Sequence, residues 1–242
     1  HLGEGHLKNT RDGFIYQAGL GSDDAEEMAS DINKEARAGQ KAVKAAITQF
    51  FESEHKSAPK FIELEEMSSF LHGRRPVLIS GASKKSWPNV TAANQQLVED
   101  TLEKLMAHLD PTKYVIVTGG TDFGVEKIAH QIAARRGFDI LGTITDNTGP
   151  QEVSTHIGNF SQLGINWFGK SRPVLTEIVK PFNGIVLFQG GGAILKEEIE
   201  LAARLNVPMF LQRDPEGAAA EAAKQYPQHS FSSYQDLQDR LP

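Results

Sequence analysis

The chain has 242 residues, 39% of them hydrophobic, and a formal net charge of −6. This content is enough for one sizeable core, so we expect one large domain or one domain with an appendage. An acidic chain without a basic cluster is poorly suited to bind nucleic acid or an anionic membrane surface. No apolar run approaches the roughly 20 residues of a membrane span. Cysteine is absent, which excludes disulfides, thiolate metal ligands and a cysteine nucleophile, and we expect a cytoplasmic protein.

The first part of the chain, residues 1–72, is polar and mostly helical in pattern, and it carries no chemical motif. Met28 and Ile32 share one face of an expected helix, which Gly39 is expected to interrupt. We interpret this region as an N-terminal helical extension that serves for packing or for homodimerisation. Because the sequence begins at His1 rather than at methionine, we expect a fragment or a trimmed terminus, with an effector domain elsewhere in the parent chain.

The second part, residues 73–242, alternates short β-rich runs with amphipathic helices. Nearly continuous apolar strands separated by helices are typical of a parallel sheet covered on both faces. The pattern therefore predicts a Rossmann-like, doubly wound α/β domain. The expected strands are 76–80, 114–118, 138–144, a short one at 165–168, 184–188 and 207–211.

Small residues follow three of these strands, and in an open parallel sheet ligands bind at the carboxyl ends of the strands. Glycine lets backbone N–H groups approach a phosphate, and the start of a helix favours an anion. A single glycine turn of this kind is more simply explained as a tight connection from strand to helix. Three of them at strand ends favour anion binding. Lys84 and Lys85 could add charge on the first turn. The predicted ligand-binding residues are Gly81, Ala82, Ser83, Thr118, Gly119, Gly120, Thr121, Gly124, Gln189, Gly190, Gly191 and Gly192.

Two of these segments resemble a known superfamily. Residues 114–127 (YVIVTGGTDFGVEK), followed by FDILGTI, resemble the SLOG superfamily. The similarity is closest to the LSDAT branch, which occurs at the amino end of melastatin-type TRP channels. Residues 183–198 (NGIVLFQGGGAILKEE) resemble the P-G-G-x-G-T-x-x-E signature of the LOG family, whose members release a base from a nucleoside monophosphate. The resemblance covers roughly residues 76–211 and implies a nucleotide-binding domain.

The resemblance also implies catalytic residues. Gly190 and Gly191 match the paired glycines and Glu197 matches the catalytic glutamate, while Gln189 replaces the proline and Ala193-Ile194 replaces the glycine-threonine pair that lines the phosphate site. Arg172 stands near the place of the family's arginine but out of register, and Lys170 is an alternative cation. Loss of the glycine-threonine pair weakens the grip on the phosphate that hydrolysis requires, so the resemblance favours nucleotide binding over hydrolysis.

Three functions follow. The first is sensing of a nucleotide or nucleotide-sugar such as ADP-ribose. The second is a LOG-type phosphoribohydrolase that uses Glu197 with Arg172 or Lys170, since a carboxylate can assist N-glycosidic cleavage. The third is a structural or interaction domain with a degenerate site. The sequence shows no H-E-x-x-H or H-x-x-x-H pairing, so we expect neither a metal nor a cofactor.

Overall fold

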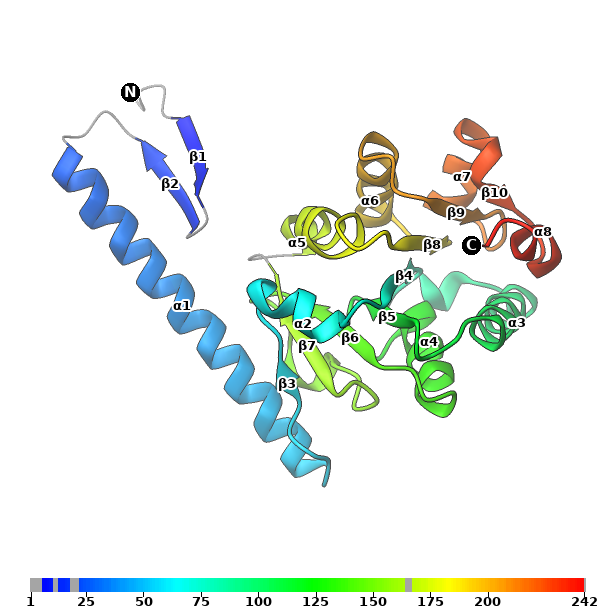
Figure 1. The fold of residues 1–242 in the computed structure, drawn as a ribbon, viewed down its shortest axis with the longest axis horizontal. Coiled ribbons are helices and arrows are strands. Elements are labelled where there is room, and N and C mark those ends of the chain that lie inside the picture. Colours follow the sequence, from blue (N-terminus) through cyan, green and yellow to red (C-terminus); the bar gives the residue numbers. More distant parts are fainter. Residues whose placement is uncertain (1–5, 11–12, 18–21, 164–166, 242) are drawn as a thin grey trace. The chain divides into compact units, whose positions relative to one another are not determined.

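A computed structural model describes residues 6–10, 13–17, 22–163 and 167–241. Its main feature is an eight-stranded sheet in the order β10-β9-β8-β4-β5-β6-β7-β3 (Figure 1). Every neighbouring pair in it is parallel. The strands in chain order are β3 (Lys60–Phe61), β4 (Arg75–Gly81), β5 (Tyr114–Thr118), β6 (Ile140–Ile144), β7 (Asn159–Gln162), β8 (Ile185–Gln189), β9 (Met209–Gln212) and β10 (Ser230–Phe231).

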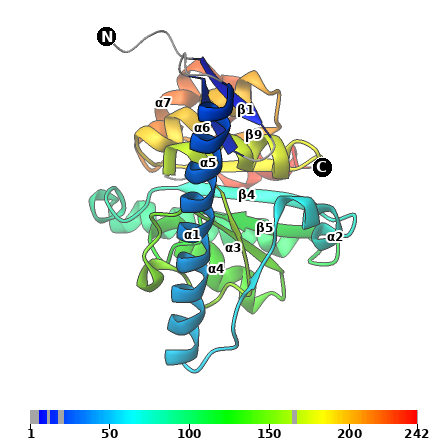
Figure 2. The same ribbon diagram turned by 90° about the vertical axis from the view of Figure 1, so that its left-hand side faces the viewer.

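Helices cover both faces of this sheet, as predicted. Figure 2 shows α3 and α4 on one side of β4, and α5, α6 and α7 on the other. Alternate strand residues serve the two faces, because successive side chains of a strand point to opposite sides. Leu78 and Val117, for example, belong to the core beneath α6 and α7. The helices are α2 (Met67–Leu71), α3 (Ala92–His108), α4 (Gly124–Arg135), α5 (Trp167–Pro173), the π-helix η4 (Val174–Val179), α6 (Ala193–Arg204), α7 (Ala218–Gln225) and α8 (Tyr234–Gln238).

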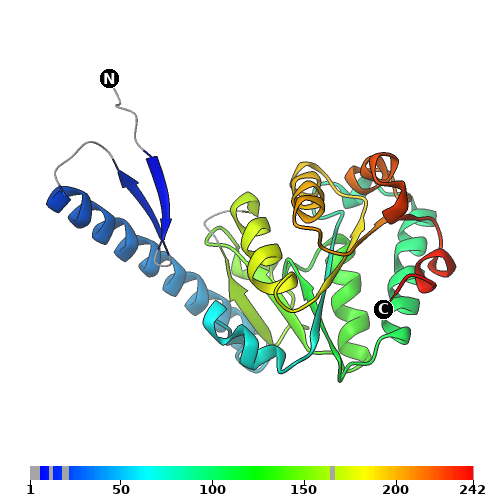
Figure 3. The ribbon, with the colours of Figure 1, turned by 45° about the horizontal axis from the view of Figure 1, so that its top comes forward.

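Short single turns join several of these elements. They are the 3₁₀ helices η1 (Leu64–Glu66), η2 (Trp87–Asn89), η3 (Pro150–Glu152) and η5 (Pro227–His229). Helix α3 begins where the sequence predicts, because the Thr91 hydroxyl accepts a hydrogen bond from the Asn94 amide and so caps the first turn. Figure 3 shows α6 and α7 following β8 and β9 on one face of the sheet.

The chain divides into two compact units, His1–Ala46 and Ile47–Pro242. The first holds an antiparallel hairpin of β1 (His6–Thr10) and β2 (Gly13–Gln17) and most of α1 (Ser22–Ser53). Helix α1 is continuous, so the expected interruption at Gly39 is wrong. A single glycine costs a helix only about 1 kcal/mol relative to alanine, which the rest of a long helix can offset.

Residues 47–72 contribute to the second unit. Ile47 and Phe51 are buried, and the Phe51 ring meets the Phe160 ring edge-on with centroids 6.0 Å apart. Strand β3 pairs with β7 and forms one edge of the sheet. This stretch of the predicted extension is therefore part of the packed α/β unit.

The strand expected at 165–168 is not found in the described residues. Trp167 opens α5, and residues 165–166 lie outside the described ranges. Its place in the sheet is taken by β7, which sits between β6 and the two-residue β3. A strand so close to the sheet edge needs little apolar sequence, and only the two central residues of Asn159–Gln162 are buried.

Candidate functional site

The glycine-rich turns meet at one edge of the sheet, as predicted. Strand β4 lies between β5 and β8, and all three run in the same direction. The last residue of β4, Gly81, is level with Gln189 at the end of β8. The turns that lead from β4, β5 and β8 into the following helices therefore surround a common space.

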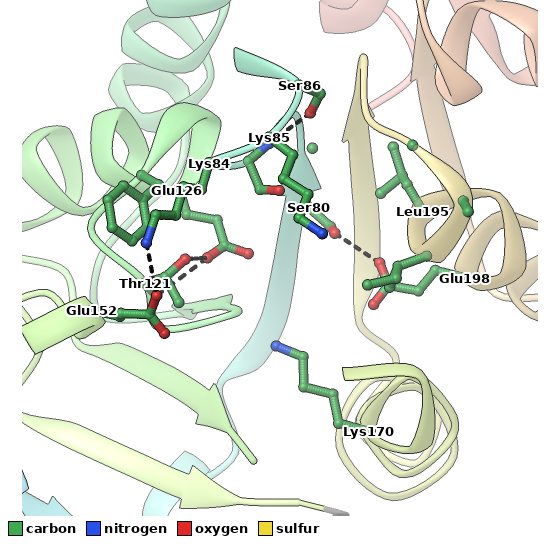
Figure 4. Close-up of a pocket in the computed structure, with 16 residues that line it drawn as sticks. Ser80, Lys84, Lys85, Ser86, Thr121, Glu126, Glu152, Lys170, Leu195 and Glu198 are labelled. Atoms are coloured by element: carbon green, nitrogen blue, oxygen red, sulfur yellow. Dashed lines mark hydrogen bonds and ion pairs between the residues drawn. The ribbon is translucent and has the colours of Figure 1, made fainter. Parts of the chain in front are cut away.

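That space is a pocket of about 530 Å³ (Figure 4). Four of the predicted ligand-binding residues line it: Gly81, Ser83, Thr121 and Gly192. Of the remaining lining residues, Lys84, Lys85 and Lys170 were expected from the sequence as cations near a phosphate, and the others were not predicted as ligand-binding residues. The remaining lining residues are Ser80, Lys84, Lys85, Ser86, Phe123, Glu126, Glu152, Lys170, Ala193, Ile194, Leu195 and Glu198.

The other predicted ligand-binding residues do not line the pocket; all are buried except Gly191, which is half-buried, and they form the turns around it. Gly124 has a φ of +57°, and a Cβ there would sit 1.9 Å from the carbonyl oxygen of Ala82, so the β4 and β5 turns touch through it. Gly120 also has a positive φ and faces Ile144 and Phe160. The residues of this group are Ala82, Thr118, Gly119, Gly120, Gly124, Gln189, Gly190 and Gly191.

Two of these buried polar side chains bond within the protein. Thr118 Oγ1 lies 2.6 Å from Nε2 of His130, a buried histidine on α4. Burial, with a smaller contribution from His156, lowers the pKa of His130 from 6.5 to about 3, so its ring is neutral near pH 7. Gln189 donates a hydrogen bond to the Gln212 side chain at the end of β9. Both side chains thus make hydrogen bonds within the protein, and neither lines the pocket.

The β5–α4 turn already holds an anion of its own. The Glu126 carboxylate accepts hydrogen bonds from the Gly119 amide at 2.9 Å, the Thr121 amide at 3.2 Å and the Thr121 hydroxyl at 2.8 Å. Glu126 stands in the first turn of α4, where a negative charge is favoured by the helix dipole. Glycine is required at 119 for this arrangement, because a Cβ would lie 2.2 Å from the carboxylate oxygen.

The carboxylate that faces the pocket from α6 belongs to Glu198. It is 5% exposed and accepts hydrogen bonds from the Ser80 hydroxyl at 2.7 Å and the Ser171 hydroxyl at 3.1 Å. Burial raises the pKa of Glu198 above its ordinary value, against the opposing effects of Lys170 and the two hydroxyls. The side chain is therefore a buried, hydrogen-bonded acid at the wall of the pocket.

Glu197 and Arg172, the catalytic candidates from the family motif, lie elsewhere. Both are exposed, and they line a separate depression of about 200 Å³. The signal that identifies Glu198 is its helical phase. It shares the inward face of α6 with Leu195, Ile199 and Ala202, so a carboxylate at that position must be buried.

Lys170 brings a second buried charge to the same wall. It projects from α5, and its Nζ donates a hydrogen bond to the Thr143 carbonyl at 2.9 Å, with the Gly119 carbonyl at 3.5 Å. Burial lowers the pKa of Lys170, while Glu126 and Glu198 act in the opposite direction. Figure 4 shows its amine pointing toward the space between Thr121 and Glu198.

The rim of the pocket is cationic where the β4 turn crosses it. Lys84 and Lys85 are both exposed there. The Lys84 amine pairs with Glu152 at 3.0 Å and lies 5.0 Å from the centre of the Phe123 ring. The pocket therefore has Lys84 and Lys85 at its mouth, with Glu152 paired to Lys84 there, and two further carboxylates, Glu126 and Glu198, with Lys170 on its wall.

Two classes of feature are absent from the described part of the chain. No group of three or more histidine, aspartate or glutamate side chains there is arranged to hold a metal ion. None of the helices in that part is both long enough and apolar enough to cross a membrane.

The fold is shared with solved structures. The protein TM1055, a structural-genomics target, is 16% identical, with a TM-score of 0.55 over 69% of this chain and 99% of that chain. The molybdenum cofactor binding protein of the phototrophic bacterium Rippkaea orientalis is 17% identical, with a TM-score of 0.53; the match covers 69% of this chain and 94% of that protein. The molybdenum cofactor carrier protein of Chlamydomonas reinhardtii is 18% identical, with a TM-score of 0.50; the match covers 67% of this chain and 92% of that protein. No family model and no curated protein sequence matches the chain.

Proposed function

We propose that this protein binds a phosphate-bearing small molecule, a nucleotide or a nucleotide-sugar, in the pocket at the carboxyl ends of β4, β5 and β8. One observation carries the proposal. A single cavity of about 530 Å³ has basic residues at its mouth and buried hydrogen-bonding side chains on its wall. Its volume falls in the range of small-molecule sites, about 300–1,000 Å³.

The mouth of the pocket suits a phosphate group. Lys84 and Lys85 supply positive charge, and the first turn of α6, from Ala193 to Leu195, faces the same space. The first amide groups of a helix have no acceptor within the helix and favour an anion. A phosphate bound at the mouth would meet both features together.

The wall of the pocket suits a sugar. The Glu198 carboxylate can accept hydrogen bonds from sugar hydroxyl groups, and Ser80 and Lys170 stand beside it. Buried polar groups of this kind give orientation and specificity to a ligand whose other contacts are apolar. The pocket supplies such contacts through Phe123, Ile194 and Leu195.

The structural neighbours give coarse support. Two of them are named for binding or carrying the molybdenum cofactor, so this architecture serves there to hold a small ligand. Membership of the SLOG superfamily and an ADP-ribose-like ligand are finer parts of the same proposal, and both come from the sequence motifs.

A second candidate function is N-glycosidic hydrolysis of a nucleotide, and the buried Glu198 favours it. A carboxylic acid with a raised pKa can serve as a general acid, and its ionised form can stabilise a cationic sugar. In this scheme Glu198 takes the role that the motif register gives to Glu197, and Lys170 replaces Arg172 as the cation.

A thermal-shift screen with product analysis tests both functions. The ligands are AMP, ADP-ribose, cyclic ADP-ribose, NAD and the nucleoside monophosphates. A ligand at 100 times its dissociation constant should stabilise the protein by ~2.7 kcal/mol. Stabilisation without turnover supports binding alone, and release of free base supports the hydrolase.

The double variant Lys84→Ala/Lys85→Ala gives the site-specific test. It should weaken any hit about tenfold, on the scale of charge-assisted hydrogen bonds. The control is Lys113→Ala. Lys113 precedes β5, at the amino ends of the strands and away from the pocket, and it pairs with Asp110. A screen without hits, or a double variant that binds as well as the wild type, would contradict the proposal and leave a structural role.

A further inference from the structure

The β5–α4 turn has the donors of an anion site, and they are already satisfied. The amides of Gly119 and Thr121 and the Thr121 hydroxyl all point to the carboxylate of Glu126, at 2.9, 3.2 and 2.8 Å. Successive amides in a glycine turn at the start of a helix are a usual way to hold phosphate oxygens. Here an oxygen pair from the protein's own side chain takes that place.

The surroundings are fitted to this carboxylate. Residue 119 must be glycine to admit it, because a Cβ would lie 2.2 Å from Glu126 Oε1. The buried Lys170 amine lies 3.5 Å from the Gly119 carbonyl oxygen and interacts electrostatically with Glu126. The carboxylate is therefore held by three hydrogen-bond donors and by the electrostatic interaction with Lys170.

The turns on the other side of the pocket are arranged differently. Lys84 and Lys85 follow β4, and Gly192 precedes α6, all along the same cavity that Thr121 and Glu126 line. An entering phosphate thus meets a basic mouth but finds a carboxylate in the β5–α4 turn. At close range two anions repel each other and neither gains the shared donors.

From this arrangement we infer that Glu126 is a specificity-determining residue: its carboxylate fills the anion site of the β5–α4 turn and excludes a second phosphate from the pocket. The inference rests on the proposed function, since it assumes that the mouth holds the first phosphate. It selects ligands in which one phosphate contacts the protein, and it disfavours those that need both groups of a diphosphate bound.

Isothermal titration with inorganic phosphate and with pyrophosphate tests the inference. The quantity measured is the ratio of the pyrophosphate affinity to the phosphate affinity. In Glu126→Ala the freed amides can take the second phosphate, so this ratio should rise about tenfold over the wild type. Glu126→Gln keeps the side chain's length without its charge and should raise the ratio about threefold. This variant provides the test if Glu126→Ala does not fold.

Asp122→Ala is the matched control. It removes one negative charge from the same turn, but Asp122 pairs with Lys127 at 3.2 Å and does not line the pocket. Its ratio should stay within about twofold of the wild type. An equal rise in Asp122→Ala, or no rise in whichever Glu126 variant folds, would overturn the inference.

The two proposals fail in different ways. If the wild type binds neither anion and the Glu126→Ala variant binds both, the phosphate site at the mouth is wrong, and the exclusion of a second phosphate, which assumes that site, is overturned with it. If the wild type and the Glu126 variants bind phosphate with unchanged preference, the mouth site stands and the exclusion is wrong. If no protein binds either anion, both are wrong.

Discussion

Ser80, at the end of β4, donates its hydroxyl hydrogen to the carboxylate of Glu198 on α6 across 2.7 Å. The bond ties a strand end to the neighbouring helix at the wall of the pocket. Of the two adjacent glutamates, Glu198 lines the pocket, whereas Glu197 lines a different depression.

Glu198→Gln and Glu197→Gln should therefore differ. If the wild type releases base from a nucleotide, we expect Glu198→Gln to lower the rate by about 10²-fold or more, the usual scale for a general acid or base. Glu197→Gln should stay within a few-fold of the wild type. The measurement is the amount of free base, determined by chromatography. The opposite pattern would show that Glu197, the residue indicated by the family motif, is the catalytic carboxylate.

Lys170→Met should destabilise the fold. The substitution removes a buried positive charge that interacts with Glu198 and leaves that carboxylate buried without it. We expect a loss of roughly 3 kcal/mol in the free energy of unfolding, the scale for removing one member of a buried charge pair. Adding Glu198→Gln should restore part of it. Urea denaturation of the two single variants and the double variant measures this coupling, and strictly additive losses would show that the groups are independent.

Gly120→Ala and Gly192→Ala should separate a folding role from a ligand role. Gly120 has a φ of +82°, and a Cβ there would lie 3.2 Å from Ile144 Cγ2. We expect alanine at 120 to cost about 1–2 kcal/mol of stability. At Gly192 a Cβ meets nothing within 4 Å, so the fold should be unaffected while ligand affinity falls. Equal stability of the two variants in thermal melting would contradict this assignment.

His130 should make the protein less stable in acid. Its pKa is about 3 in the folded protein and near 6.5 when unfolded, so below pH 6.5 the unfolded chain binds a proton that the folded chain does not. The contribution is complete above pH 6.5 and is lost as the pH falls toward 3, at up to ~1.4 kcal/mol per pH unit. Denaturation between pH 4 and pH 7 should show a shallower slope for His130→Gln. The control is His108→Gln, because His108 is an exposed residue at the end of α3, and this variant should keep the wild-type slope. Equal slopes in both variants would show that His130 does not cause the loss of stability in acid.

The central strands could be predicted from the sequence because their residues are apolar on both faces. The segments PVLIS, YVIVT and GIVLF became β4, β5 and β8, and their order placed the glycine turns together. The outer strands could not be recognised in this way. Strand β7 reads NFSQ, and β3 is only two residues long, so both depend on pairing with the rest of the sheet.

The position of the pocket was predictable from the sequence, but its lining was not. The glycine turns indicated the edge of the sheet where the pocket lies. The family motif pointed to Glu197, whereas the helical phase of α6 turns Glu198 inward. Nothing local in the sequence shows that Lys170 reaches the Gly119 and Thr143 carbonyls, because that contact joins residues far apart in the chain. The use of the β5–α4 amides by Glu126 likewise depends on the shape of the turn.

The large sheet is bounded by two strands of two residues each, Lys60–Phe61 at one edge and Ser230–Phe231 at the other. A long exposed edge would offer unpaired amides and carbonyls as a template for strands from other molecules. Edges this short offer few such groups. The short edge strands therefore limit edge-to-edge pairing of this sheet with strands of other molecules.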